Sequence, residues 1–460
     1  MRLKGLIGNG AFYRRVLKIS VPIMIQQGIT NFVGLLDNIM VGSLSTEAMS
    51  GVSIVNQFIF IFYLMVFGAI SAAGIFTAQY QGSSDTEGVR STFRLKIIIT
   101  MLSTVLGTVL FVFLGEALIS TFLHSSEGAG DLALTMSYGK EYLAVMLIGL
   151  LPYSLSQVYA STMRETGETV TPMIASVIAV GTNFVLNIVL IFGYLGAPAL
   201  GVVGAAVATV ASRFAELAIL IICGHTNKKK YSFLLGAYRS FKIPIPLLRE
   251  VIKRGLPLMA NEVLWSVSMT LRNQSYSVRG LDAVAAQNIA NTLGNVLSVA
   301  YMALGSAVAI IIGNLLGAGK LDEARDENKK LLTFSVMCGL AMGLLMVALS
   351  GIFPNLYNTT ESVRSLSTYM IIIIALTMPT GAFAHATYFA LRSGGKVFST
   401  FLFDCGFNWL TIVPVSIILA NFTSIGIVPL FAICQCLDML KCAIAAYLIK
   451  KGSWVRRIIV

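Results

Sequence analysis

The chain has few charged residues. Only 12% of its 460 residues are Asp, Glu, Lys or Arg, whereas 56% are hydrophobic, and the mean hydropathy is +0.81. A soluble protein of this length needs a more highly charged surface. The composition therefore excludes a soluble domain of useful size and predicts a protein embedded in a membrane.

Residues and motifs for metal, nucleotide or covalent chemistry are also scarce. The chain has three histidines, and its six cysteines have neither a CxxC nor a zinc-finger spacing. It contains no Gly-rich phosphate loop with GK[ST], and no HExxH or GxSxG motif. We therefore expect no enzyme, no ATP-driven step carried out by this chain alone, and no bound organic or metal cofactor.

Long apolar runs fill most of the chain. Short polar breaks separate twelve of them, and a helix of about 20 residues crosses a hydrocarbon core of about 30 Å. The first run holds Pro22 and Asp37 and lacks a cleavage site, so we do not expect a cleavable signal peptide. We predict an all-α polytopic membrane protein with twelve transmembrane helices over residues 16–41, 53–79, 95–115, 140–162, 171–195, 201–223, 256–278, 286–316, 331–353, 366–391, 398–420 and 426–449.

The basic residues fall on one side of these spans. With the N-terminus in the cytoplasm, 27 of the 33 Lys and Arg residues lie in cytoplasmic segments. This bias is the positive-inside pattern and predicts that both termini are cytoplasmic in the inner membrane. It also accounts for the net charge of +12 without a nucleic-acid partner. We expect a monomer that contacts the lipid bilayer.

A basic polar segment divides the chain into two sets of six spans. Pro22 matches Pro257 at an offset of 235, and Arg164 matches Arg392 at an offset of 228. This near-constant offset indicates a duplication, with an N-lobe at 1–223, a basic cytoplasmic linker at 224–254 and a C-lobe at 255–460. Since six is an even number, both halves enter the membrane the same way. Substrate is then expected between the lobes, with transport by rocking of one lobe against the other.

Three segments carry a resemblance to a known family. They are Pro22-x3-Gln26…Asp37-x3-Val41-Gly42, Asn183-x3-Asn187 with its continuation to Thr209, and Gly313-x3-Gly317-Ala318-Gly319. The chain resembles the multidrug and toxic compound extrusion (MATE) transporters over essentially its whole length. The resemblance implies two pseudo-symmetric six-helix lobes that form a V-shaped central cavity. It also implies export of organic, often cationic, compounds against an inward flow of H+ or Na+.

Polar residues of the first lobe form a candidate coupling site. A rise of 1.5 Å per residue places Asp37, Asn183, Asn187 and Thr209 in one layer of the outer half of the membrane. Their carboxylate, amide and hydroxyl oxygens suit Na+, with Asp37, Asn183 and Asn187 as its ligands, and the same carboxylate can instead carry a proton. The resemblance implies that the matching aspartate and asparagines bind the cation. The alternative is that these groups only hydrogen-bond neighbouring helices.

The second lobe has its own intramembrane carboxylates, Glu262 and Asp404. Such groups are unfavourable in lipid and are therefore candidates for coupling or substrate binding. The resemblance implies acidic residues in the seventh and tenth spans. Glu262 approximates the first, whereas the tenth span offers only His385. Asp404 can substitute from the neighbouring helix, or can simply pair with Arg392 or Lys441.

Polar and paired residues elsewhere complete the candidates. Gln57, Gln287 and Asn291 are expected to contact substrate, and the last two share a helix face that should point to a cavity or a neighbouring helix. Two pairs of oppositely charged residues lie three positions apart on a helix: Arg213 with Glu216, and Asp438 with Lys441. The two charges of each pair are expected to neutralise each other, so we assign both pairs a structural role.

Two other functions stay open. A relative on the same architecture can export or flip a lipid-linked or polysaccharide precursor. An intramembrane enzyme or channel needs a clustered catalytic set or a pore-lining ring, and the sequence presents neither. The choice between H+ and Na+ is also open.

Overall fold

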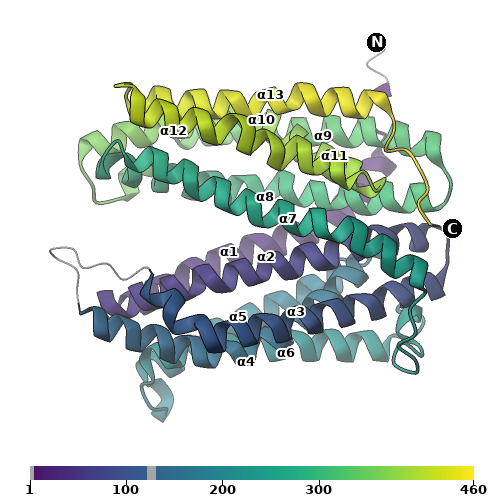
Figure 1. Ribbon diagram of the computed structural model, residues 1–460, viewed down its shortest axis with the longest axis horizontal. Coiled ribbons are helices and arrows are strands. Elements are labelled where there is room, and N and C mark those ends of the chain that lie inside the picture. The colour runs from purple at the N-terminus through teal and green to yellow at the C-terminus, as the bar shows by residue number, and fades with distance from the viewer. Residues whose placement is uncertain (1–4, 122–130, 460) are drawn as a thin grey trace. The chain divides into compact units, whose positions relative to one another are not determined.

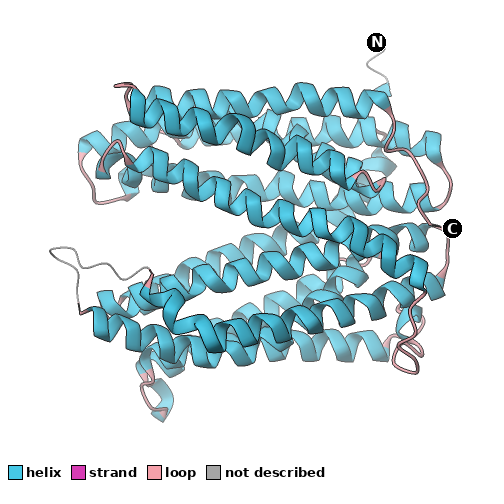
Figure 2. Cartoon of the chain, in the orientation of Figure 1, coloured by secondary structure: helices cyan, strands magenta, loops and turns pink. Residues whose placement is uncertain are grey.

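The computed structural model describes residues 5–121 and 131–459, and within these ranges all regular structure is helical (Figures 1 and 2). The first ten long helices are α1 (Gly10–Gly42), α2 (Thr46–Gly82), α3 (Thr86–Ser120), α4 (Leu132–Glu165), α5 (Val170–Phe192), α6 (Gly201–Thr226), α7 (Ile245–Ser277), α8 (Leu281–Gly317), α9 (Leu321–Leu349) and α10 (Glu361–Ser393).

The eleventh segment is irregular and the twelfth is regular. The eleventh consists of α11 (Val397–Phe401), the π-helices η5 (Leu402–Gly406) and η6 (Asn408–Ile412), and α12 (Val413–Phe422). The twelfth is α13 (Ile427–Lys451). Short 3₁₀ helices lie in the connections: η2 (Tyr194–Gly196), η3 (Ser232–Leu234) and η4 (Phe353–Leu356).

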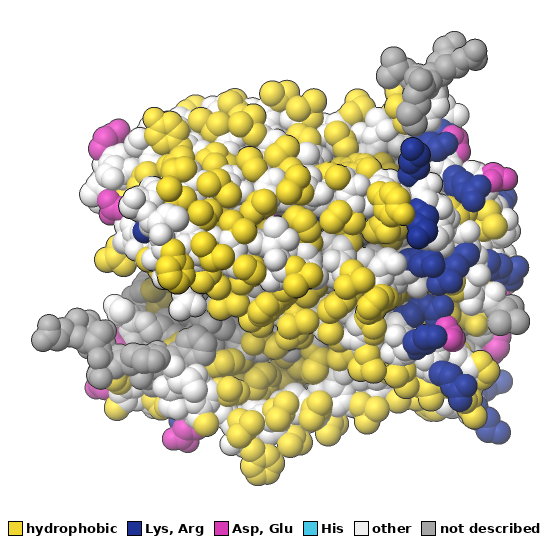
Figure 3. Space-filling view, turned by 45° about the horizontal axis from the view of Figure 1, so that its top comes forward, with side chains coloured by type: hydrophobic (Ala, Val, Ile, Leu, Met, Phe, Trp, Pro, Cys, Tyr) yellow, Lys and Arg dark blue, Asp and Glu magenta, His cyan; other side chains and the backbone are white. Residues whose placement is uncertain are grey.

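Each of the twelve predicted spans coincides with a helical segment. Among the described residues, ten segments are long and apolar enough to cross a membrane. The other two, α1 and α7, are more polar but have 33 residues each, and thus a length of about 50 Å. On the face drawn in Figure 3, hydrophobic side chains cover the middle of the helices, and Lys and Arg gather at one end. This is the surface of a multi-span membrane protein.

Several boundaries differ from the predicted ones. The fifth span was predicted to reach residue 195, but α5 ends at Phe192 because Gly193 adopts a left-handed conformation with φ of 75°. The predicted linker at 224–254 is partly helical, since α6 continues to Thr226 and α7 begins at Ile245. Helices that carry polar first and last turns extend beyond their apolar runs, which apolarity alone does not reveal.

The chain forms two compact units. Unit 1 comprises Met1–Met24, Ala78–Asp85 and Leu256–Val460, and unit 2 comprises Ile25–Thr77 and Thr86–Gly255. This division differs from the predicted lobes at 1–223 and 255–460. The start of α1 belongs to unit 1 because Phe12, Val16 and Ile19 are buried in one hydrophobic cluster with residues of α8 and α10. The segment 224–255, which contains the predicted linker, groups with unit 2.

Small residues bring α5 and α6 of unit 2 into close contact. A Cβ on Gly204 would lie 2.5 Å from the carbonyl oxygen of Leu190, so only glycine fits there. Ala205 and Ala208 on the next turn are buried as well. Small residues allow two membrane helices to approach until their polar side chains meet. Asn183 and Thr209, which lie on these two helices, are thereby brought within hydrogen-bonding distance.

Candidate functional site

The four predicted residues of unit 2 form one hydrogen-bonded cluster. Asn187 Nδ2 donates to Asp37 Oδ1 at 2.5 Å and lies 3.2 Å from Asn183 Oδ1. Asn183 Nδ2 in turn donates to Thr209 Oγ1 at 3.2 Å. Three helices contribute: α1 holds Asp37, α5 the two asparagines and α6 the threonine. The four residues that depth along the helices assigned to one layer are therefore hydrogen-bonded neighbours in the structure.

The Asn183 amide is the point where oxygen atoms converge. One of its two amide atoms lies 3.0 and 3.2 Å from the two carboxylate oxygens of Asp37. If that atom is nitrogen, it donates to the carboxylate. If it is oxygen, three oxygens meet and need a proton or a cation between them to offset their repulsion. The cluster can therefore serve either as a hydrogen-bonded layer or as the ligand set of a cation.

The surroundings leave the Asp37 carboxylate with neutral partners. Among the described residues no ion pair of 4.0 Å or less involves Asp37. The nearby cation Arg213 is engaged by Glu216 at 3.4 Å, as the sequence predicted. Its guanidinium also lies 5.1 Å from the ring centre of Tyr153 and 5.9 Å from that of Tyr63. A carboxylate held only by amides retains the capacity to bind an external cation.

In unit 1, the predicted carboxylates Glu262 and Asp404 lie near each other through shared polar neighbours. Tyr388 donates its hydroxyl to Glu262 Oε1 at 3.4 Å. Asn261 Nδ2 lies 3.2 Å from Asp404 Oδ2 and 3.5 Å from the Tyr388 hydroxyl. Asn261 and Tyr388 thus connect the two acids, one from α7 and the other from η5. Tyr388 could not be predicted from the sequence, because its connecting role depends on how α10 packs.

Asp404 is also part of a buried ion network. Lys441 Nζ on α13 lies 3.3 Å from Asp404 Oδ1 and 3.1 Å from Asp438 Oδ1. Arg272 on α7 then pairs with Asp438 Oδ2 at 3.1 Å. Of the two partners considered for Asp404, Lys441 is the one that it contacts. Arg272 was not among the predicted site residues, because its pairing across to α13 depends on how the helices pack.

The other predicted residues are dispersed. Gln57 is exposed on α2 of unit 2, and Asn291 is half-buried on α8 of unit 1. Gln287 is buried and donates to Asn273 Oδ1 of α7 at 2.8 Å, so it faces a neighbouring helix. The ring of His385 packs against Phe389 with centroids 5.0 Å apart, as expected for a packing histidine.

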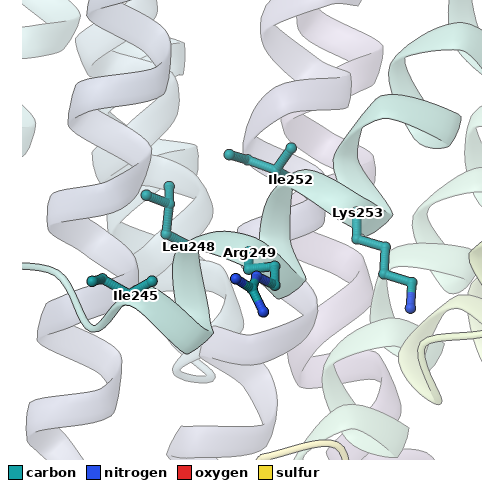
Figure 4. Close-up of a pocket in the computed structure, with 5 residues that line it drawn as sticks. All are labelled: Ile245, Leu248, Arg249, Ile252 and Lys253. Atoms are coloured by element: carbon teal, nitrogen blue, oxygen red, sulfur yellow. The ribbon is translucent and has the colours of Figure 1, made fainter.

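A pocket of about 390 Å³ lies at the first turns of α7 (Figure 4). Its lining contains two basic residues and no acid: Ile245, Leu248, Arg249, Ile252 and Lys253. It therefore lacks the carboxylate that a cation site requires. In the described part of the chain no group of three or more His, Cys, Asp or Glu could hold a metal ion. The single carboxylate of the Asp37 cluster suits a proton or a monovalent cation better than a multivalent metal.

Comparison with known proteins identifies relatives of this fold and sequence. Residues 22–189 and 257–418 both match the MatE family. A probable multidrug resistance protein NorM of Thermotoga maritima is 26% identical over 419 residues, covering 90% of this chain and 87% of its own. The NorM of Bacillus subtilis, named in the same way, is 24% identical over 423 residues, with 90% of each chain covered.

A solved structure shares the architecture. The protein is described as a MOP superfamily transporter from Pyrococcus furiosus whose binding pocket has reverse polarity, suggesting a different function. Its TM-score is 0.86 at 18% identity, with 98% of this chain and 97% of that chain covered. The two family matches fall one in each half, as expected for pseudo-symmetric lobes, and together they span well over half of the sequence. This protein belongs to the MatE family of multi-pass membrane transporters.

Proposed function

We propose that this protein is a secondary active multidrug efflux transporter. It exports organic, often cationic, compounds in exchange for inward-moving H+ or Na+ by alternating access. Relatives in the same family are named multidrug resistance proteins, which supports this substrate class. The single observation that carries the coupling part is the Asp37 cluster, in which one intramembrane carboxylate is held by amides and not by a basic side chain.

Coupling in this proposal begins with neutralisation of Asp37. A proton or Na+ at the carboxylate competes with Asn187 for the same oxygen, and Na+ also recruits the Asn183 amide oxygen. Loss or exchange of these hydrogen bonds changes how α1, α5 and α6 pack. A cation that binds one arrangement of these helices more tightly shifts the protein toward it. If the drug prefers the other arrangement, the two ligands drive each other across the membrane.

Unit 1 supplies further contacts in this proposal. Glu262 is the carboxylate best suited to attract a cationic drug or a second proton, since the group that donates a hydrogen bond to it is the neutral hydroxyl of Tyr388. Gln287 and Asn291 of unit 1 remain proposed substrate contacts, as does Gln57 of unit 2. Asp404 takes the alternative role of a partner to Lys441.

The proposed location is the inner membrane of the cell, with both termini in the cytoplasm and the protein acting as a monomer. The gathering of Lys and Arg at one end of the helices supports this orientation (Figure 3).

Reconstituted efflux tests the proposal. Proteoliposomes loaded with cationic and zwitterionic dyes receive a proton gradient or a sodium gradient, one at a time. Either gradient alone should drive dye movement, and Asp37→Asn should reduce it at least about tenfold. Glu116→Gln is the matched control, because it removes a carboxylate of unit 2 that is exposed and paired with Lys140.

Two results would contradict the proposal. Wild-type efflux by Asp37→Asn would remove Asp37 from the mechanism. Failure of both gradients across the dye panel would favour the lipid-linked substrate, and a lipid-flipping assay on the same vesicles would then decide.

A further inference from the structure

We propose that the Lys441 ammonium occupies a monovalent-cation site in unit 1. In this view the side chain is a covalently attached counterpart of the transported ion, so unit 1 is permanently loaded. The site itself does not depend on the proposed function. Only its consequence, that ion coupling is left to the Asp37 cluster of unit 2, rests on that proposal.

The first support is the position of the ammonium. Lys441 Nζ lies 3.1 Å from Asp438 Oδ1 and 3.3 Å from Asp404 Oδ1, and the residue is only 7% exposed. The two carboxylates come from different segments, α13 and η5. The ammonium thus joins two helices from a buried position between their acids. A small cation with oxygen ligands would bridge the same pair of carboxylates.

The second support is the balance of charge. Arg272 pairs with Asp438 at 3.1 Å, so the network holds two carboxylates and two basic side chains and is neutral. Removal of Lys441 leaves one negative charge in the interior without compensation. An uncompensated charge inside the membrane is strongly unfavourable and will recruit a counter-ion.

The third support is a neutral ligand beside the pair. Asn261 is 2% exposed, and its Nδ2 lies 3.2 Å from Asp404 Oδ2. Its Oδ1 is buried and has no hydrogen-bond partner within the described chain. Such an oxygen is a ready ligand for a hard cation once the amide turns. Asp404 itself lies in a π-helix, a geometry that often occurs at functional sites.

The corresponding residue of unit 2 has different partners. Arg213 and Lys441 lie at the same offset of 228 as Arg164 and Arg392, on α6 and α13. Arg213 is engaged by Glu216 at 3.4 Å and by two tyrosine rings, and within the described residues it forms no ion pair of 4.0 Å or less with Asp37. Asp37 of unit 2 is thus available to an external ion, whereas Asp404 of unit 1 already pairs with the ammonium of Lys441.

Ion-dependent stability of purified protein tests the site. All variants carry Asp37→Asn, so that the Asp37 cluster of unit 2 contributes no ion effect. The unfolding temperature of each variant in NaCl is compared with that in choline chloride, at equal ionic strength and about pH 8.5. Lys441→Gln should raise the unfolding temperature in Na+ by about 3 °C or more. The parent and the charge-preserving control Lys441→Arg should change by less than about 1 °C. Adding Asp404→Asn to Lys441→Gln should abolish the gain.

The outcomes separate cleanly. If Lys441→Gln shows no gain with Na+, K+ or Li+, the cation-site proposal is overturned, whatever the result of the efflux assays. If that variant does not fold, the neutral pair Asp404→Asn with Lys441→Gln replaces it, in protein with Asp37 intact. Gradient-driven efflux within about twofold of wild type is then expected, since no net charge is left in the site. A loss as large as that of Asp37→Asn would make Asp404 a coupling carboxylate and refute the proposal.

Discussion

Lys96 and Glu165 form an ion pair of 2.5 Å in the interior of unit 2, and the Lys96 side chain has no exposed surface. The ammonium also lies 3.2 Å from the hydroxyls of Ser161 and Thr162, so it has three hydrogen-bond partners. Gly74 of α2 lies directly against the Glu165 carboxylate. The pair therefore joins α3 to α4 at a point where α2 has no side chain.

Breaking this pair should destabilise the protein strongly. Lys96→Met leaves Glu165 without its buried partner, and we expect a loss of about 3–5 kcal/mol in the free energy of unfolding. The double variant Lys96→Met/Glu165→Gln removes both charges and should recover at least half of that loss. Denaturation of Lys96→Met, Glu165→Gln and the double variant in detergent, analysed as a double-mutant cycle, measures the coupling. Additive effects of the two substitutions would contradict the prediction.

Asn187 should set the strength of cation binding at Asp37. Asn187→Ala removes the amide donor that lies 2.5 Å from the Asp37 carboxylate. It also removes the hydrogen bond from this amide to Asn183 Oδ1. Hydrogen bonds to charged groups contribute about 1.5–3 kcal/mol, and this donor competes with the cation for the carboxylate oxygen, so the concentration of coupling ion for half-maximal efflux should fall roughly tenfold or more. Thr182→Ala, an exposed position on the same helix, serves as the control. An unchanged ion dependence in Asn187→Ala would exclude this role.

Gly317 should not tolerate a methyl group. A Cβ there would overlap the carbonyl oxygen of Gln79, because the ends of α2 and α8 touch through their backbones in unit 1. Gly317→Ala is expected to lower stability by about 1–3 kcal/mol or more through overpacking. Gly181→Ala on α5 has open space around its Cβ and should be neutral or slightly stabilising. Thermal unfolding of both variants measures the difference, and equal midpoints would be evidence against the close contact.

The Glu168–Lys230 pair should hold the segment after α6 in a pH-dependent way. Burial alone would raise the pKa of Glu168, but the Lys230 ammonium at 2.6 Å and the backbone N–H of Thr171 lower it below its usual 4.5. The hydrogen bond to Glu168 raises the pKa of Lys230 above its usual 10.5. The carboxylate's contribution is therefore complete above pH 4.5 and lost as the pH falls through its folded pKa. The ammonium's contribution is complete below pH 10.5 and lost as the pH rises through its folded pKa.

Hydrogen exchange of residues 227–236 measures this contact. At pH 7, Glu168→Gln should exchange up to about fivefold faster than wild type, the limit for an exposed pair. The difference should shrink as the pH falls through the lowered folded pKa of Glu168, and the two proteins should match once the wild-type carboxylate is protonated. A difference that persists unchanged in acid would show that the pair does not hold the segment.

The sequence was sufficient to predict the spans and the Asp37 cluster. Apolar length and charge asymmetry locate helices without knowledge of their packing. Depth along a helix is also nearly independent of packing, which is why Asp37, Asn183, Asn187 and Thr209 were assigned to one layer.

Other features depend on how helices rotate and approach. The pairing of Arg272 with Asp438 and the link from Glu262 through Tyr388 require the relative orientation of α7, α10 and α13, which spacing does not encode. The start of α7 at Ile245 could not be predicted from apolar length, because the first turns of this helix are basic and amphipathic. Division of α1 between the two units follows from side-chain packing near Pro22 and likewise has no signature in composition.

The π-helices η5 and η6 give the eleventh segment a register that no substitution could provide. A π turn holds about one residue more than an α turn, so removal of a single residue there would restore α-geometry. Everything on one side of the deletion would then turn by about 100° around the helix axis. Asp404 would swing away from Lys441 and Asn261 while every amino-acid type stayed the same. The partnership of Asp404 and Lys441 is thus fixed by the number of residues in the helix as much as by their identity.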